Sequence, residues 1–311
     1  MRADREAAAR SAAVTRRVFA SIATLVVCMA SIAFAEAPAP EPSADAVLAD
    51  LPFLTGPEGA PLEIRIDLAS EGAHPLPLLV DTGSPESFAT PRAASDLGIS
   101  LRRSKQTPYR RATRLGRDLE VNVDTRRGER GAAADGEWAV LGARFLSAYV
   151  VEIDLPRRRV RFLDPKRFAV PERVDAPGEA VLPFRLAGHR PVIEIEIGAA
   201  KVPAAITTGA PGTLLLPGGH VQDAGLIADP EASKSIQPMP GAGRLEAMTA
   251  PRIRIGPFEQ TDVPILVAEF GAQGAGARSE ALLGVELLQD YVIRLDYSRK
   301  RLWIARREQI P

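Results

Sequence analysis

One acidic residue follows an apolar segment directly, at a place where its carboxyl group could take part in catalysis. In LLVDTGSPESFATP (residues 78–91), three apolar residues lead into Asp81, and a Thr-Gly turn comes next. A related stretch, AITTGAPGTLLLP (residues 205–217), has Thr207 at the corresponding position. A carboxylate can act as a general acid or base, whereas a Thr hydroxyl stays neutral near pH 7. The chemistry of the chain therefore depends on how these two segments are related.

Other catalytic and metal-binding patterns are missing from the sequence. The three histidines, His74, His189 and His220, are scattered without the spacing of metal ligands, so we expect no metal and no cofactor. The sequence contains no G-x-S-x-G motif of a serine hydrolase and no phosphate-binding loop. The formal net charge of +0 gives no reason to expect a polyanionic partner such as nucleic acid.

The two segments occupy equivalent places in two halves of the chain that repeat each other loosely. Alternating apolar and charged residues predict a strand with one buried face at LEIRIDL (residues 62–68) and at IEIEI (residues 193–197). Each of these strands leads into one of the Thr-Gly turns. A short helix is predicted after the first turn, because Thr90 can cap it and Pro91 suits its first position.

The ends of the two halves match without a gap. LGARFLSAYVVEIDLPRRRVRF (residues 141–162) aligns with LGVELLQDYVIRLDYSRKRLWI (residues 283–304), which pairs Gly142 with Gly284. Each copy predicts a short helix after the Gly, then a strand, a basic turn and a second strand. Internal duplication explains a match of this length better than chance does. We therefore expect two β-rich lobes of similar plan.

An apolar strand that ends in Asp-Thr-Gly-Ser, followed later by Val140-Leu141-Gly142, resembles a lobe of the pepsin/retropepsin family of aspartic proteases. The resemblance covers residues 50–308. It implies an all-β fold of two retropepsin-like lobes in a pepsin-like arrangement, with a few short helices. In that family each lobe brings one Asp to a shared two-fold axis, where two carboxylates share a proton across a bound water.

The resemblance assigns catalysis to Asp81, whose carboxylate Ser84 would hydrogen-bond. Thr207 takes the place of the second acid, and Ala210 takes the place of Ser84. The remaining matches are loop and structural residues: Thr82, Gly83, Thr208, Gly209, Gly142 and Gly284. The family also covers its cleft with a β-hairpin flap, for which residues 107–117 and 238–248 are the candidates.

The missing second carboxylate leaves three interpretations open. Losing a positioned general acid or base costs about 10²–10⁴-fold in rate. The dyad is completed by Asp81 of a second molecule, or the chain is a slow single-carboxylate hydrolase, or it is a pseudoprotease that binds peptides without cutting them. An aspartic-type endopeptidase is the leading interpretation and the pseudoprotease its alternative. Each implies a peptide or unfolded protein as the partner, and the oligomeric state stays open.

The first residues have the marks of an export signal. Arg16 and Arg17 precede the uncharged run VFASIATLVVCMASIAFA (residues 18–35), which ends in Ala-Phe-Ala. We expect cleavage after Ala35 and a periplasmic or secreted protein; a retained membrane anchor is the alternative. Cleavage would also remove Cys28, the only cysteine. The predicted divisions are a signal peptide (1–35), a Pro/Ala-rich spacer (36–49), a first lobe (50–175) and a second lobe (176–311).

Overall fold

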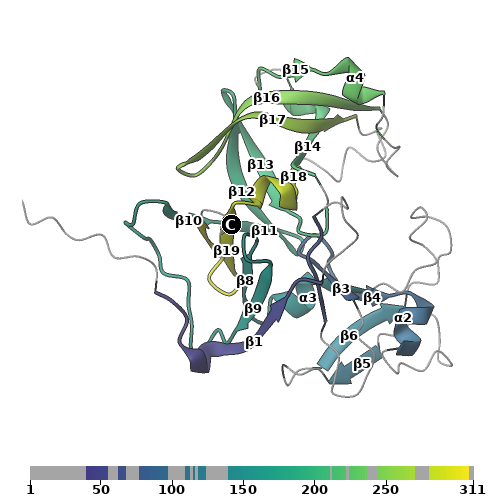
Figure 1. The fold of residues 1–311 in the computed structure, drawn as a ribbon, viewed down its shortest axis with the longest axis vertical. Coiled ribbons are helices and arrows are strands. Elements are labelled where there is room, and N and C mark those ends of the chain that lie inside the picture. Colours follow the sequence, from purple (N-terminus) through teal and green to yellow (C-terminus); the bar gives the residue numbers. More distant parts are fainter. Residues whose placement is uncertain are drawn as a thin grey trace, which may run out of the picture. The chain divides into compact units, whose positions relative to one another are not determined.

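The computed structural model is built from β-strands and a few short helices (Figure 1). It describes residues 40–54, 62–67, 77–96, 109–112, 115, 118–123, 139–210, 212–221, 224–234, 236, 244–269 and 280–307. The fold class predicted from the sequence is confirmed. The predicted signal peptide and the start of the spacer lie outside the described residues. Within the described part, no helix is long and apolar enough to span a bilayer.

A six-stranded sheet from the first half carries Asp81 at the end of one of its inner strands. Its spatial order is β2-β3-β7-β4-β6-β5. The strands are β2 (Arg65–Asp67), β3 (Pro77–Asp81), β4 (Ser87–Ala89), β5 (Tyr109–Ala112), β6 (Asp118–Val123) and β7 (Ala139–Gly142). The predicted helix follows β4 as α2 (Pro91–Asp96). Thr90 Oγ1 accepts a hydrogen bond from the backbone N–H of Ala93 (3.2 Å), so the predicted cap is confirmed.

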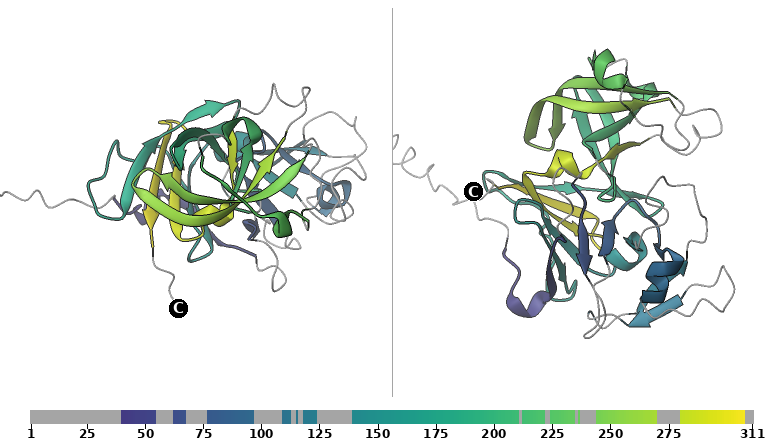
Figure 2. Two further views of the ribbon diagram at one scale, coloured as in Figure 1. Left: turned by 90° about the horizontal axis from the view of Figure 1, so that it is seen from above. Right: turned by 45° about the vertical axis from the view of Figure 1, so that its right-hand side comes forward.

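An eight-stranded sheet from the second half carries Thr207 directly after one of its inner strands. Its order is β11-β12-β13-β18-β14-β17-β16-β15, and an additional pairing of β12 with β16 closes part of it into a ring, which Figure 2 shows from above. The strands are β11 (Arg185–Ala187), β12 (Arg190–Ile197), β13 (Ala200–Ile206), β14 (Leu214–Pro217), β15 (Ile227–Ala228), β16 (Leu245–Ile255), β17 (Phe258–Ala268) and β18 (Ala281–Leu283). Two short helices, η3 (Gly218–His220) and α4 (Pro230–Ser233), follow β14 and β15.

The two sheets share one pattern of strand pairing around the Thr-Gly turns. In the first half, β3–β7 is parallel, β7–β4 antiparallel, β4–β6 parallel and β6–β5 antiparallel. In the second half, β13–β18, β18–β14, β14–β17 and β17–β16 repeat the same series. Asp81 consequently lies opposite Gly142, and Thr207 follows Ile206, which lies opposite Leu283.

A third sheet takes strands from both halves, in the order β1-β9-β8-β19-β20-β10. Its strands are β1 (Val47–Pro52), β8 (Val150–Asp154), β9 (Arg159–Leu163), β10 (Glu179–Pro183), β19 (Tyr291–Asp296) and β20 (Arg301–Arg306). The short helices α3 (Ala143–Leu146) and η4 (Val285–Leu288) precede its two hairpins. This is the predicted succession of helix, strand, turn and strand in both copies.

The centre of the third sheet holds a buried ion pair. The antiparallel pairing of β8 with β19 sets Glu152 opposite Arg294, and the aligned copies also match these two positions. Arg294 Nε lies 2.6 Å from Glu152 Oε2, with side-chain exposures of 2% and 1%. The Arg294 guanidinium also stacks 4.0 Å from the ring centroid of Trp303. The ion pair therefore joins equivalent residues of the two halves, one on β8 and one on β19.

Candidate functional site

Two Thr-Gly loops, one from each half, meet through reciprocal hydrogen bonds. The backbone N–H of Thr82 donates to Thr208 Oγ1 (3.1 Å), and that of Thr208 donates to Thr82 Oγ1 (3.2 Å). Each hydroxyl then donates to the opposite strand end, Thr82 to the carbonyl of Ile206 (2.6 Å) and Thr208 to that of Val80 (2.7 Å). Since each Thr is buried and bonded to the other half, these contacts fix residue 81 relative to residue 207.

The Asp81 carboxylate is held by backbone groups of both loops. Its Oδ1 accepts from the N–H of Gly83 (2.7 Å) and from the N–H of Gly209 (3.2 Å). Gly83 lies two residues after Asp81, and Gly209 lies two residues after Thr207. Asp81 therefore uses the amide of its own loop and the equivalent amide of the other loop. Two N–H donors on one oxygen favour the ionised carboxylate.

Thr207 directs its methyl group toward Gly83 of the Asp81 loop and its hydroxyl toward its own half. Its Oγ1 donates to the carbonyl oxygen of Leu283 (3.2 Å), and its backbone N–H donates to the same oxygen (3.0 Å). A methyl group added to Gly83 would lie 2.7 Å from Thr207 Cγ2 and 3.0 Å from Asp81 Oδ1. Asp81 and Thr207 thus border the same space, and the only hydroxyl proton of Thr207 is used within its own half.

Glycines allow the close approach of backbone that this arrangement needs. A methyl group added to Gly209 would lie 2.3 Å from Cγ of Asp81, so any larger residue there would displace the carboxyl group. At Gly142 and Gly284, an added methyl would lie 2.3 Å from a backbone carbonyl oxygen of the turn packed against each. The predicted loop and structural glycines therefore occupy positions where a side chain would collide with backbone, with Asp81 or with Thr207.

Comparisons with known proteins give similarity at the level of solved structures alone. No protein-family model matches the chain, and no curated protein shows a significant sequence match. A retropepsin-like aspartic protease from Rickettsia conorii matches at 19% identity and a TM-score of 0.30, over 41% of this chain and 89% of that one. Basic 7S globulin from soybean matches at 13% identity and a TM-score of 0.43, over 79% and 93%.

The role expected for Ser84 is not the one found. Its Oγ donates to the carbonyl oxygen of Glu86 (2.8 Å), and a serine hydroxyl has only one proton to give. Ser84 therefore stabilises the turn that follows the Thr-Gly pair and does not donate to Asp81. The backbone turn after residue 84 is what brings the Glu86 carbonyl within reach, and a motif read from sequence does not contain that information.

Tyr297 is a residue near this site that the sequence analysis missed. It is 6% exposed, and its hydroxyl has no hydrogen-bond partner among the described residues. Burial raises the pKa of Tyr297 above its ordinary value, and the negative charge of Asp81 raises it further. The hydroxyl consequently keeps its proton over the physiological pH range. Comparison of the two copies could have drawn attention to it, because the first half has Leu155 at this position.

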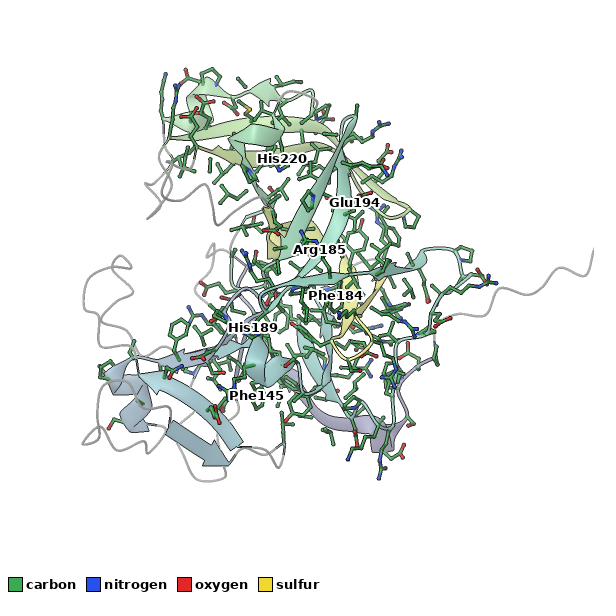
Figure 3. All side chains as sticks on the ribbon, turned by 180° about the vertical axis from the view of Figure 1, so that it is seen from behind. Phe145, Phe184, Arg185, His189, Glu194 and His220 are labelled. Carbon is green, nitrogen blue, oxygen red and sulfur yellow. The ribbon has the colours of Figure 1, made fainter. Side chains whose placement is uncertain are left out.

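The other residues considered in the sequence do not gather into a second site. Figure 3 shows His189 and His220 well apart, and His74 lies outside the described residues. In the described part of the chain, no group of three or more His, Cys, Asp or Glu side chains could hold a metal ion. More than half of each candidate flap lies outside the described residues; the flaps were predicted at residues 107–117 and 238–248.

Proposed function

We propose that the chain acts on peptides as an aspartic-type hydrolase with a single catalytic carboxylate, Asp81. The observation that carries the proposal is the attachment of Asp81 Oδ1 to Gly83 of its own loop and to Gly209 of the opposite loop. This attachment orients the carboxylate without a second acid. Asp81 is only half-buried, so water and a peptide can reach it.

The proposed reaction uses one carboxylate as base and then as acid. Ionised Asp81 takes a proton from water while the water oxygen attacks the peptide carbonyl carbon, and the carbonyl electron pair moves onto its oxygen. Asp81 then returns that proton to the leaving nitrogen as the C–N bond breaks. The oxyanion receives no proton from Thr207, whose hydroxyl donates to Leu283. A missing general acid costs about 10²–10⁴-fold, so we expect slow cleavage.

A peptide-binding pseudoprotease is the second candidate, and one observation favours it. The amide of Gly209, which a carboxylate at position 207 would use, donates to Asp81 instead. With that amide occupied and Thr207 turned to Leu283, position 207 offers no acidic group to a bound peptide. The loops would then retain a peptide-binding frame without cleavage.

A dyad completed by a second molecule is the least favoured alternative. Thr207, Thr208 and Gly209 already fill the place beside Asp81 that another copy of the first loop would need. Such pairing would require both bonds between Thr82 and Thr208 to break, together with their bonds to Ile206 and Val80. A monomer therefore suffices for either proposed function.

The proposed place of action is outside the cytoplasm, as a periplasmic or secreted protein. The support is the basic, apolar and small-residue succession that ends at Ala35. Mass spectrometry of the protein recovered from the producing cell tests this: a chain beginning at Glu36 supports export, and a full-length chain in the cytoplasmic fraction contradicts it.

The test of hydrolysis is cleavage of an unfolded protein, such as reduced and alkylated casein, between pH 3 and 7. We expect slow cleavage by the wild-type chain and none by Asp81→Asn, which keeps the size of the side chain and removes the base. Asp50→Asn is the matched control, since Asp50 forms an exposed ion pair on β1. Tight peptide binding with no cleavage at any pH would support the pseudoprotease instead.

A further inference from the structure

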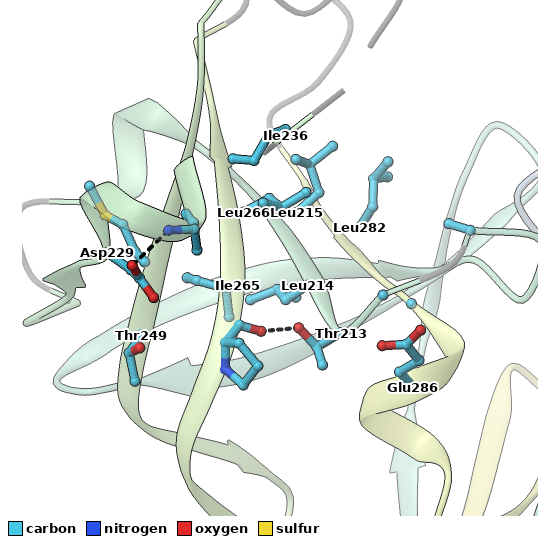
Figure 4. Close-up of a pocket in the computed structure, with 17 residues that line it drawn as sticks. Thr213, Leu214, Leu215, Asp229, Ile236, Thr249, Ile265, Leu266, Leu282 and Glu286 are labelled. Carbon is cyan, nitrogen blue, oxygen red and sulfur yellow. Dashed lines mark hydrogen bonds between the residues drawn. The ribbon is translucent and has the colours of Figure 1, made fainter. Parts of the chain in front are cut away.

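The second half contains a pocket of about 450 Å³ that takes no part in the proton transfers of the proposed reaction (Figure 4). It lies among β14, β16, β17, β18 and α4. One of its lining residues is Ala210, which comes three residues after Thr207 in the chain. Its walls are mainly aliphatic, and the larger apolar side chains include Leu214, Leu215, Met248, Ile265, Leu266 and Leu282. A volume of this size is typical of sites for small organic ligands.

The charged residues among the described lining are both acids, Asp229 and Glu286. Asp229 has a structural role, because its Oδ1 accepts from the N–H of Ala232 (2.9 Å) and caps α4. Glu286 has no ion pair and no side-chain hydrogen bond with any described residue. Figure 4 shows its carboxylate extending from η4 toward Thr213. Thr213 is itself engaged, since its hydroxyl donates to the carbonyl oxygen of Pro264.

The equivalent residue in the first half, Arg144, belongs to a network of ion pairs. Arg144 lies two residues after Gly142, as Glu286 lies two residues after Gly284. Arg144 pairs with Glu120 (2.9 Å) and with Glu86 (3.9 Å). In the second half the charge is reversed at Glu286, and the facing turn of Gly212 and Thr213 carries no charge. The carboxylate of Glu286, unpaired among the described residues, therefore stands where the first half has an arginine engaged in ion pairs.

We propose that this pocket binds an apolar molecule bearing one ammonium group, with Glu286 as the counter-ion. The aliphatic walls favour a hydrocarbon chain or ring, because burial of apolar surface stabilises binding. The Glu286 carboxylate favours a positive charge at one end, because a carboxylate beside apolar surface gains most from a paired cation. The ligand is a free amine or the lysine side chain of a peptide. This site does not depend on Asp81, so it can exist whether or not the chain hydrolyses peptides.

Met248 supplies a direct spectroscopic reporter, because it lines the pocket and the chain has only four methionines. We expect n-hexylamine to shift the ¹³C-methyl resonance of Met248 in a saturable manner, and 1-hexanol and hexanoate to bind at least ~10-fold more weakly. Equal affinity for the amine and the alcohol would contradict a counter-ion role for Glu286. No shift of Met248 with the amine or with a lysine peptide would overturn the site itself.

Two variants and one control separate the contribution of the Glu286 charge to binding from that of the apolar pocket. Glu286→Gln should weaken hexylamine binding at least ~10-fold, and Leu282→Trp should abolish it by filling the pocket. Asp229→Asn should retain binding within ~3-fold, because Asn is an equally good helix cap. Urea unfolding followed by circular dichroism reports that each variant is folded. Unchanged affinity in both Glu286→Gln and Leu282→Trp would refute the proposal.

Two further titrations identify the source of the ligand and separate this proposal from hydrolysis. An acetylated pentapeptide with one central Lys is compared with the same peptide carrying norleucine. A shift of Met248 with the Lys peptide alone assigns the site to peptide side chains, and a shift with hexylamine alone assigns it to free amines. Asp81→Asn should leave amine binding unchanged; its loss in that variant would contradict an independent site.

Discussion

The backbone N–H groups of Thr82 and Thr208 each donate to the side-chain oxygen of the other residue, at 3.1 and 3.2 Å. Both side chains are buried, at 0% and 2% exposure. Each Oγ1 also donates to a strand end of the opposite half. The contact between Thr82 and Thr208 therefore sets the relative position of Asp81 and Thr207. Mutating Thr82 or Thr208 tests this contact without changing Asp81 or Thr207.

Thr208→Val should destabilise the fold by about 2–4 kcal/mol. The change keeps the shape of the side chain but leaves the Thr82 N–H and the Val80 carbonyl buried without their partner, each at a cost of ~1–3 kcal/mol. Urea unfolding followed by circular dichroism measures the difference. Thr208→Ser keeps the hydroxyl and should lose about 1 kcal/mol or less. Equal stability of the Val and Ser variants would mean that the reciprocal bonds do not join the halves.

Arg294→Met should cost about 1.5–3 kcal/mol, because it removes the charged hydrogen bond to buried Glu152 that crosses the two halves, while Arg161 keeps its ion pair with the other oxygen of that carboxylate. Met preserves much of the side-chain volume against Trp303. The matched control is Asp50→Asn, which removes the pair between Arg159 and Asp50 where both side chains are 41% exposed. That exposed pair should contribute about 1 kcal/mol or less. Comparable losses in the two variants would contradict a joining role for Arg294.

Tyr297→Phe should leave the fold equally stable at pH 7 or stabilise it by roughly 1 kcal/mol, because the removed hydroxyl is buried without a described partner. The pH dependence has a definite sign. Burial, and then Asp81, raise the pKa of Tyr297, so the folded state keeps a proton that the unfolded state loses above pH ~10. Wild-type stability should therefore fall as the pH rises above ~10.

The variant Tyr297→Phe has no phenol to titrate and should lose less stability over that range. Urea unfolding of both proteins at pH 7 and at pH 10.5 measures the difference. If the free energy of unfolding fell equally in both proteins between pH 7 and pH 10.5, the pKa of Tyr297 would not be raised by folding. A clear loss of stability at pH 7 in the variant would instead reveal a partner for the hydroxyl, such as a buried water.

The features of the site that were predictable from the sequence are those fixed by local pattern. The apolar run before Asp81 predicts a buried strand, and β3 ends at that residue. The aligned copies that begin at Gly142 and Gly284 predict the helix, strand, turn and strand that both halves contain. Such features depend on neighbours in the chain, so periodicity and turn residues are sufficient to indicate them.

The features that escaped prediction depend on which segments meet in space. The hydrogen bond from the Ser84 hydroxyl to the Glu86 carbonyl oxygen depends on the backbone conformation of the turn between these residues. The pairing of Glu152 with Arg294 follows from the register of β8 against β19, which joins residues from different halves. The sharing of the Gly209 amide with Asp81 likewise requires both loops to be in place.

The central claim is that Asp81 and Thr207 face each other on a frame that lacks only the second acid. The most direct test is the cleavage rate of unfolded casein by Thr207→Asp at acidic pH, with Asp81→Asn/Thr207→Asp as the control. An Asp at 207 would compete with Asp81 for the Gly209 amide, which lies two residues after it as Gly83 lies two residues after Asp81. We expect a gain of about 10²–10⁴-fold over the wild-type chain, abolished in the double variant. A folded Thr207→Asp protein that cleaves no faster than wild type would contradict this account.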